Sequence, residues 1–402
     1  MKKKVVSVLL AAAMTTAALA GCGSSNGSSS SDASTGADST STASASSAAA
    51  DDGEKKDNSS EKIAMITDSG DITDESFNQI TWETVCDYGD ANGIEYEYYK
   101  PAEDTDEERI NSIDLAISEG ATVVVMPGYL FGPAIAEEQD TYPDVTFIAV
   151  DVTEGDIVNL SGDAVDLGKN VYICSFEEEQ AGYLAGYAAV KDGYTSLGFL
   201  GGIAVPAVIR FGYGYVQGIN AAAEEDGVDV NVKYYYGGQF YGDQQIKAFM
   251  DGWYKNRGVE VVFACGGGIW TSAADAAKDA GGKVIGVDTD QSALINAYAD
   301  GMCVTSAMKG LGATVKSVLK AIQEGNWSEY AGKIESLGLV SADDVDANYV
   351  QLPLETWSMK NFSVDDYRKL VADIFNGNIK ISAETSSEPA HKLTLNTYPN
   401  IK

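Results

Sequence analysis

The sequence contains a single histidine, His391, close to its C-terminal end. This scarcity excludes a catalytic apparatus with a mid-chain His base and a metal site that needs two His ligands. The cysteines form no Cys-x-x-Cys pair, which excludes zinc ribbons and thioredoxin-like chemistry. They stand at Cys22, Cys86, Cys174, Cys265 and Cys303. Because the last four lie among apolar neighbours, we expect them to be small buried side chains.

Basic residues are also scarce. Lysine and arginine together number 27 against 60 aspartates and glutamates, and the formal net charge is −33. A surface of this charge repels phosphate backbones, so we expect no nucleic-acid partner. It also argues against attachment to an anionic membrane through basic patches.

The N-terminal segment has the pattern of a secretory signal peptide, with three lysines in residues 1–4 and an apolar stretch at 5–20. It ends in Leu19-Ala20-Gly21-Cys22, which resembles a bacterial lipobox. The resemblance implies cleavage after residue 21 and acylation of Cys22, and therefore a lipid anchor at the extracytoplasmic face of the cell membrane. The alternative is an ordinary signal peptide with a chance cysteine. Residues 23–60 hold no aromatic or branched aliphatic side chain, so we expect 22–60 to be a disordered, lipidated tether.

From residue 62 onward, apolar runs alternate with helical patterns, which predicts an α/β fold with parallel sheets covered on both faces. About ten such strands exceed one comfortable sheet, so we expect two lobes. The expected strands are 62–67, 122–126, 146–150, 171–175, 197–200, 228–236, 261–265, 283–287 and 302–308. The expected helices are 104–119, 208–225, 244–256, 271–280 and 313–324. Thr105 and Glu108 form a capping box at the first of them.

Polar groups follow several of these strands. Asp68, Asp151 and Asp288 each come directly after a strand, and residues 266–268 are three glycines after another. Ligands of open parallel sheets bind beyond the carboxyl ends of the strands, so two facing lobes bring these groups to one cleft. Lys309 is the obvious partner for the three acids. An Asp after a strand is also a common turn residue, and this spacing alone indicates a hydroxyl-rich, uncharged or cationic ligand.

The stretch from Asp68 to Glu83 (DSGDITDESFNQITWE) resembles the opening motif of the basic membrane protein family. These are lipid-anchored solute-binding proteins of ABC importers, typified by purine nucleoside receptors. Further matches stand at 147–151, 180–186, 205–218, 261–267, 285–291 and 304–309, and the likeness is weak after residue 332.

The resemblance implies a type I periplasmic-binding fold, with a hinge between lobes, that closes on a nucleoside, most readily a purine nucleoside. It implies stacking on the base by Phe77 and Phe240, and contacts to the base from Asp68 (or to the ribose) and from Asn78. It further implies that Asp151, Asp288 and Lys309 hold the ribose hydroxyls and that Gly267 contributes a backbone contact. Two departures stand out: the 236–241 segment is one residue longer than in the family, so Tyr236 or Tyr241 could supply the second ring, and Trp270 could cap or narrow the pocket.

We therefore expect a monomeric, non-enzymatic binding lipoprotein that delivers a nucleoside to an ABC permease, with no cofactor and no metal. The expected organisation is a signal peptide at 1–21, a tether at 22–60, a first lobe of 62–174 plus 292–337 and a second lobe of 175–291 plus 338–402. The alternatives are a receptor of the same fold for a sugar or a signalling molecule that serves a sensor system and, ranked last, a calcium-dependent nucleoside hydrolase. The base, the affinity and the partner are left open by the sequence.

Overall fold

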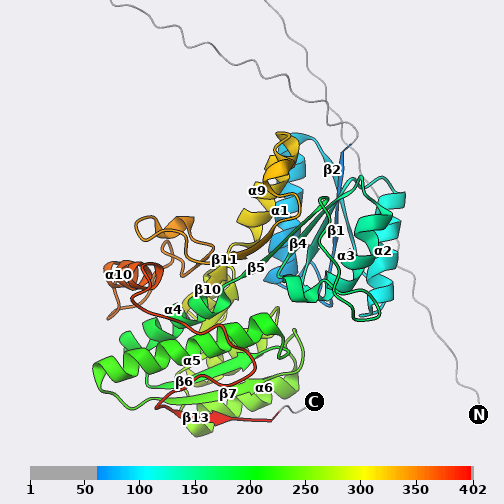
Figure 1. Cartoon of the computed structure of the whole chain (residues 1–402). Coiled ribbons are helices and arrows are strands. Elements are labelled where there is room, and N and C mark those ends of the chain that lie inside the picture. The colour runs from blue at the N-terminus through cyan, green and yellow to red at the C-terminus, as the bar shows by residue number, and fades with distance from the viewer. Residues whose placement is uncertain (1–60, 400–402) are drawn as a thin grey trace, which may run out of the picture. The chain divides into compact units, whose positions relative to one another are not determined.

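The computed structural model describes residues 61–399, whose strands form two sheets, each flanked by helices (Figure 1). The predicted signal peptide, Cys22 and the tether lie outside these residues. Within the described residues, no helix is both long enough and apolar enough for a membrane span.

The first sheet has six parallel strands in the order β11-β5-β4-β3-β1-β2. Their bounds are β1 (Lys62–Ile66), β2 (Glu95–Tyr99), β3 (Val123–Pro127), β4 (Thr146–Val150), β5 (Val171–Phe176) and β11 (Ile334–Leu337). Side chains along β1 alternate between two cores, because successive residues of a strand point to opposite faces. One face is covered by α1 (Phe77–Asn92) and α9 (Leu311–Gln323), and the other by α2 (Asp106–Ser118) and α3 (Gly132–Thr141) (Figure 1).

The second sheet has seven strands in the order β12-β10-β9-β8-β6-β7-β13, and all pair in parallel except β12 with β10. Their bounds are β6 (Ser196–Gly201), β7 (Asn231–Tyr236), β8 (Val261–Cys265), β9 (Lys283–Asp288), β10 (Cys303–Lys309), β12 (Val350–Gln351) and β13 (Thr394–Thr397). The remaining α-helices are α4 (Glu178–Lys191), α5 (Pro206–Asp226), α6 (Gln244–Asp251), α7 (Trp270–Ala280), α8 (Ser292–Asn296) and α10 (Val364–Phe375). The single-turn segments are η1 (Tyr129–Phe131), η2 (Glu154–Asp156), the π-helical η3 (Gly252–Asn256), η4 (Trp327–Glu329) and η5 (Val345–Ala347).

Most of the predicted elements are confirmed within a few residues. The side chain of Thr105 caps α2 by accepting the Glu108 backbone N–H at 3.3 Å, as the capping motif predicts. The helix expected at 244–256 divides into α6 and the π-helical η3. The cysteine prediction is confirmed except at Cys86, which is partly exposed because it lies beside the buried face of α1 rather than on it.

One boundary differs from the expected lobes. The sequence pattern predicts that residues 292–337 belong to the first lobe, yet β10 pairs along its length with β9 in the second sheet. Within this range, α9, which packs on α1 and β4, η4, which packs on α9, and β11, which pairs with β5, belong with the first sheet. The chain therefore returns to the first lobe directly after Lys309. This crossing places Lys309 at the junction of the two lobes.

Helices α4 and α5 of the second lobe pack unusually closely because glycines line their contact. A Cβ atom at Gly214 of α5 would lie 2.1 Å from the Glu179 carbonyl oxygen of α4, and one at Gly182 would lie 2.1 Å from the Phe211 carbonyl oxygen. Backbone therefore contacts backbone, which only glycine permits. This packing brings the N-terminal ends of the two helices, with Glu178 and Arg210, to the same place.

We expect Gly214→Ala to lower the free energy of unfolding by about 1–3 kcal/mol, because the added methyl group cannot be accommodated between two backbones. The matched control is Gly252→Ala, at a helical position where a Cβ would meet nothing within 4 Å. That change should be neutral or add about 0.4–1 kcal/mol. Urea denaturation of both variants measures the difference, and equal midpoints would contradict the close-contact explanation.

Candidate ligand-binding site

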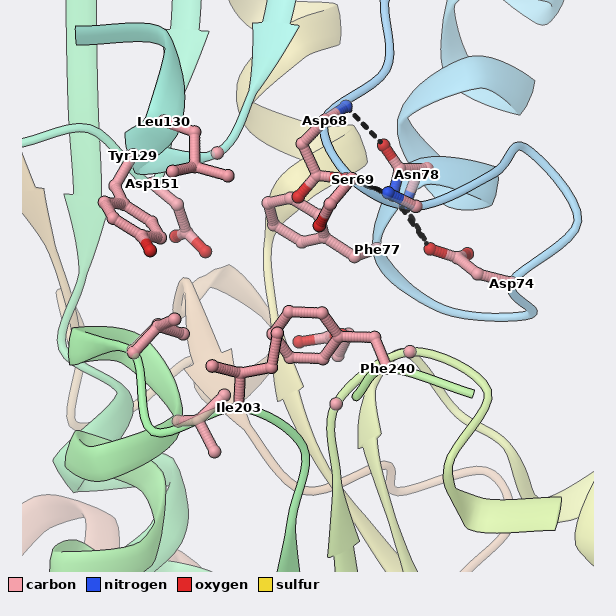
Figure 2. Close-up of a pocket in the computed structure, with 18 of the residues that line it drawn as sticks. Asp68, Ser69, Asp74, Phe77, Asn78, Tyr129, Leu130, Asp151, Ile203 and Phe240 are labelled. Atoms are coloured by element: carbon pink, nitrogen blue, oxygen red, sulfur yellow. Dashed lines mark hydrogen bonds between the residues drawn. The ribbon is translucent and has the colours of Figure 1, made fainter. Parts of the chain in front are cut away.

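A cavity of about 770 Å³ lies at the carboxyl ends of strands from both sheets (Figure 2). From the first lobe, its lining follows β1 to β4; from the second lobe, it follows β6 to β10. All eight ligand-binding residues predicted from the sequence line this one cavity: Asp68, Phe77, Asn78, Asp151, Phe240, Gly267, Asp288 and Lys309. Whether each contacts a ligand stays a prediction.

Two aromatic rings form opposite walls of the cavity. Phe77, the first residue of α1, and Phe240, in the loop after β7, face each other from the two lobes (Figure 2). Phe240 rests on glycine backbone, because a Cβ at Gly202 or Gly266 would come within 2.5 or 2.9 Å of its ring. The first glycine of the triglycine segment thus makes room for the ring. Gly267 has a φ of +49° and packs on the Phe240 carbonyl oxygen.

The structure places the aromatic residues of the 236–241 segment and Trp270 differently with respect to the cavity. Of the three candidate aromatics in the 236–241 segment, Phe240 and Tyr241 line the cavity, whereas the Tyr236 hydroxyl hydrogen-bonds to that of Tyr234 at 2.9 Å. Trp270 does not line the cavity. Its side chain is buried in the core between α7 and the second sheet, where it packs edge-on against Tyr298. It therefore neither caps nor narrows the pocket.

The floor of the cavity is a buried ammonium group surrounded by carboxyl groups. Lys309 Nζ hydrogen-bonds to Asp151 and lies 3.7 Å from Asp288 Oδ1 and 3.6 Å from Glu178 Oε1. Burial alone would lower the pKa of Lys309, but the surrounding carboxylates outweigh it and the pKa lies above its ordinary value. Burial raises the pKa of Asp288, and the nearby ammonium only partly offsets this.

Two of these acids adopt a backbone conformation that is uncommon for residues other than glycine. Asp151, after β4, has a φ of 61°, and Asp288, at the end of β9, has a φ of 64°. Aspartate is among the few residues that tolerate the left-handed region. The same local geometry at the ends of strands from different lobes brings both carboxylates to Lys309.

Glu178 and Arg210 belong to the same charge cluster, although we did not single them out in the sequence. Arg210 Nε donates a hydrogen bond to Glu178 Oε2 at 2.6 Å. Burial raises the pKa of Glu178, and Arg210 and Lys309 only partly counter this. Both residues fall next to or within the segments that resemble the family, which was the available signal. Three carboxyl groups thus share two cations.

Three contacts in this region join the two lobes. The Ser76 hydroxyl donates to Asp288, the Gln291 side-chain amide donates to the Glu75 carbonyl oxygen at 2.9 Å, and Lys309 binds Asp151 across the same junction. Ser76 and Gln291 lie inside the matching motifs but were not predicted as functional residues. The structure therefore has the lobes bridged at the back of the cavity.

Asn78, two residues after Ser76, positions two acids that line the cavity. Its side-chain NH₂ donates to Asp68 Oδ1 and to Asp74 Oδ2, each at 3.0 Å, and its oxygen accepts the Asp68 backbone N–H at 3.4 Å. The amide that we expected to bond a base edge is thus engaged in holding Asp68 (Figure 2). Burial raises the pKa of Asp68 to about 6, although the Gly70 N–H and Asn78 bonds partly oppose this.

The arrangement suits a neutral ligand with hydroxyl groups. The basic side chains among the described residues that line the cavity each pair with a carboxylate: Lys100 with Asp71, Arg210 with Glu178 and Lys309 with Asp151. Asp151 Oδ1 is buried and accepts no hydrogen bond from any described residue, so the cost of removing it from water is not offset within this part of the chain. In residues 61–399, no group of three or more His, Cys, Asp or Glu side chains is placed to hold a metal ion.

The chain is similar in sequence to proteins of a known family. Residues 61–384 match the model of a family described as ABC transporter substrate-binding protein, PnrA-like. An ABC transporter nucleoside-binding protein of Lactococcus lactis subsp. cremoris is 28% identical over 284 residues, which are 66% of this chain and 76% of the relative. An uncharacterized lipoprotein of Pyrococcus abyssi is 26% identical over 326 residues, covering 78% of this chain and 76% of the relative.

Solved structures show the same fold. A solute-binding protein of an ABC transporter system from Aeropyrum pernix superimposes with a TM-score of 0.67 at 20% identity, over 81% of this chain and 94% of that one. A second, from Conexibacter woesei, has a TM-score of 0.62 at 22% identity over 80% of this chain and 99% of that one. The two sheets thus form a type I periplasmic-binding fold, as predicted.

We expect Lys309→Met to lower the free energy of unfolding by about 3–5 kcal/mol near neutral pH, because it leaves buried carboxylates without their cation. The matched control is Lys100→Met, which removes a half-exposed pair with Asp71 and should cost less than about 1 kcal/mol.

The deficit of Lys309→Met should also shrink as the pH falls. Without the ammonium, the pKa values of Asp288 and Glu178 in the folded state rise further above those of the unfolded chain, so protonation favours the folded state. Denaturant unfolding at pH 8 and pH 5.5 measures this, and a deficit that is equal or larger at pH 5.5 would show that the carboxylates do not depend on Lys309.

Proposed function

The chain belongs to the PnrA-like family of ABC transporter substrate-binding proteins, and we propose that it captures a nucleoside, with a purine base, between its two lobes for an ABC importer. Proteins of this family bind a solute and are not enzymes. The observation that carries the proposal is the facing pair Phe77 and Phe240 next to a buried carboxylate, Asp151, with a free acceptor oxygen. The name of the Lactococcus relative supports the same ligand class.

In this proposal, the aromatic pair binds the base by stacking. A flat ring between Phe77 and Phe240 gains stacking on both faces, and stacking of a base on an aromatic side chain contributes about 1–3 kcal/mol. The ring of Phe77 is itself held by Lys309, whose Nζ lies 4.7 Å from the ring centroid. Phe240 packs on the backbone of Gly202 and Gly266. Both walls are therefore set before the base enters, which reduces the ordering cost of binding.

In this proposal, the charge cluster binds the sugar hydroxyls. Ribose hydroxyls can donate to Asp151 Oδ1 and to Asp288, and can accept from Lys309. Carboxylates make the stronger hydrogen bonds to such donors. A site built in this way rejects an analogue that lacks the hydroxyl, because its own buried groups are then left unpaired.

The same cluster disfavours phosphorylated ligands. A phosphate needs a cation or a set of N–H donors, and the basic groups of the cavity are already paired with acids. Further acids line the cavity, among them Asp71, Asp74 and Asp156. The proposed ligand is thus the nucleoside and not the nucleotide.

We further propose that the folded part is held at the extracytoplasmic face of the membrane by a lipid on Cys22, and that it works there as a monomer with its permease. The lipobox-like segment supports the anchor, and the relative from Pyrococcus abyssi is named a lipoprotein.

The first test is calorimetric titration with inosine, adenosine, guanosine and ribose. We expect purine nucleosides to bind, and Phe240→Ala to weaken them by about 5- to 150-fold, which corresponds to the loss of one stacking contact. The control is Phe375→Ala, at an exposed position of α10. Absence of heat with every nucleoside, in folded protein, would reject the proposal, and binding of ribose without inosine would select a sugar receptor.

The second test uses the titration of Asp68. If the ionised carboxylate accepts the N1–H of inosine, binding is lost as the pH falls through about 6, where burial places the pKa of Asp68. We expect affinity to be constant above pH 7 and to fall by about tenfold per unit below the pKa.

The matched variant for this test is Asp68→Asn, which cannot titrate. It should bind more weakly at pH 7.5 but with a flat profile between pH 5 and 7. Parallel profiles for the wild type and the variant would remove Asp68 from the base contact.

A further inference from the structure

The cavity continues beyond the aromatic pair into a region walled by apolar side chains, which we call the apolar annex. Its walls are Tyr129 and Leu130 of the first lobe and Ile203, Val205 and Val208 of the second. Figure 2 shows Tyr129 and Leu130 opposite Ile203, to one side of Phe77 and Phe240. Asp151 lies beside Tyr129 and close to Leu130 in the same view (Figure 2).

The annex leaves apolar surface without cover. Ile203 is 39% exposed although it lines a cavity, and Leu130 opposite it is only partly buried. Aliphatic surface of this kind gains free energy when a ligand removes it from water. The cavity volume of about 770 Å³ is also in the upper part of the range for sites of drug-sized ligands, roughly 300–1,000 Å³. A base between the rings and a ribose on the acids occupy the part of the cavity next to the annex.

The annex is not simply an open gap between separated lobes. The back of the cavity is already closed by the Ser76–Asp288, Gln291–Glu75 and Lys309–Asp151 contacts. The annex is present in the structure together with these bridges. Its space therefore belongs to the bridged arrangement of the two lobes.

The surrounding charges limit what can enter. Arg210, two residues after Val208 in α5, pairs with Glu178. Asp104 and Asp156 of the first lobe also line the cavity. An anionic substituent would find no unpaired cation among the cavity-lining residues that the structure describes. The walls therefore suit an uncharged, apolar group.

We propose that the apolar annex is a subsite for an apolar substituent at the 5′ position of the nucleoside, such as an alkyl thioether. This inference rests on the proposed function. With the base between the rings and the 2′- and 3′-hydroxyls on the acids, C5′ is the remaining exocyclic carbon of the sugar. A group on C5′ passes Asp151 and enters the annex. The ligand class thus includes 5′-S-alkyl-5′-thionucleosides.

The test is a calorimetric series of inosine and its 5′-S-methyl, 5′-S-ethyl and 5′-S-propyl thioether analogues. We expect affinity to rise by about fourfold for each added methylene, the factor that corresponds to about 0.8 kcal/mol per buried CH₂. Ile203→Ala and Leu130→Ala, from opposite walls, should each reduce the gain per methylene. The matched control is Val228→Ala, which has the same 39% exposure as Ile203 but does not line the cavity, and it should keep the full gain.

The outcomes separate the two proposals. Binding of inosine with a flat or falling series overturns the annex and leaves nucleoside binding standing. A full gain in both wall variants also overturns the annex, because the alkyl group then lies elsewhere. If Ile203→Ala weakens inosine and every thioether equally, Ile203 is a contact of lobe closure and the subsite is rejected. Failure of inosine and of all its analogues to bind rejects the nucleoside proposal itself.

Discussion

The structure depends on one buried ammonium group, that of Lys309, and on the acids that must surround it. A lone charge of this kind cannot be buried, so its burial requires Asp151 from the first lobe and Asp288 and Glu178 from the second. This requirement holds strand ends of different sheets together, and Ser76 and Gln291 add neutral hydrogen bonds across the same junction. Because Lys309 is also the last residue of β10, the chain crosses to the first lobe at the point where the charges meet.

The walls of the cavity follow from close packing rather than from charge. Glycines between α4 and α5 allow the helices to touch through their backbones, which delivers Glu178 and Arg210 to the cluster. Gly202 and Gly266 likewise leave room for Phe240, whose ring lies where their side chains would be. The proposal of a flat, neutral ligand rests on this aromatic wall and on a floor whose cations are paired with acids. This is the chemistry expected of a solute receptor that must hold its ligand without reacting with it.

The charge balance inside the cavity differs from the net charge of this very acidic protein. The formal charge of −33 is spread over the chain, but the deepest part of the cavity is nearly balanced, with three carboxyl groups sharing two cations. The net charge repels anions, and the proposed nucleoside would place a hydroxyl donor next to the Asp151 carboxylate. The apolar annex is the part of the cavity that neither effect explains.

The α/β class, the strands that are buried along their length and the meeting of Asp68, Asp151 and Asp288 at one cavity could all be predicted from the amino-acid sequence. Buried strands appear as continuous apolar runs, and parallel strands end at a common edge. The sequence did not reveal the strands β2, β11, β12 and β13, where exposed or short segments pair only with distant partners. Nor did it reveal that β10 belongs to the second sheet or that Asn78 holds Asp68. These points depend on long-range contacts, since Lys309 and Asp151 are 158 residues apart and Ser76 and Asp288 are 212 apart. Local pattern carries no information about which buried charge will meet which across such distances.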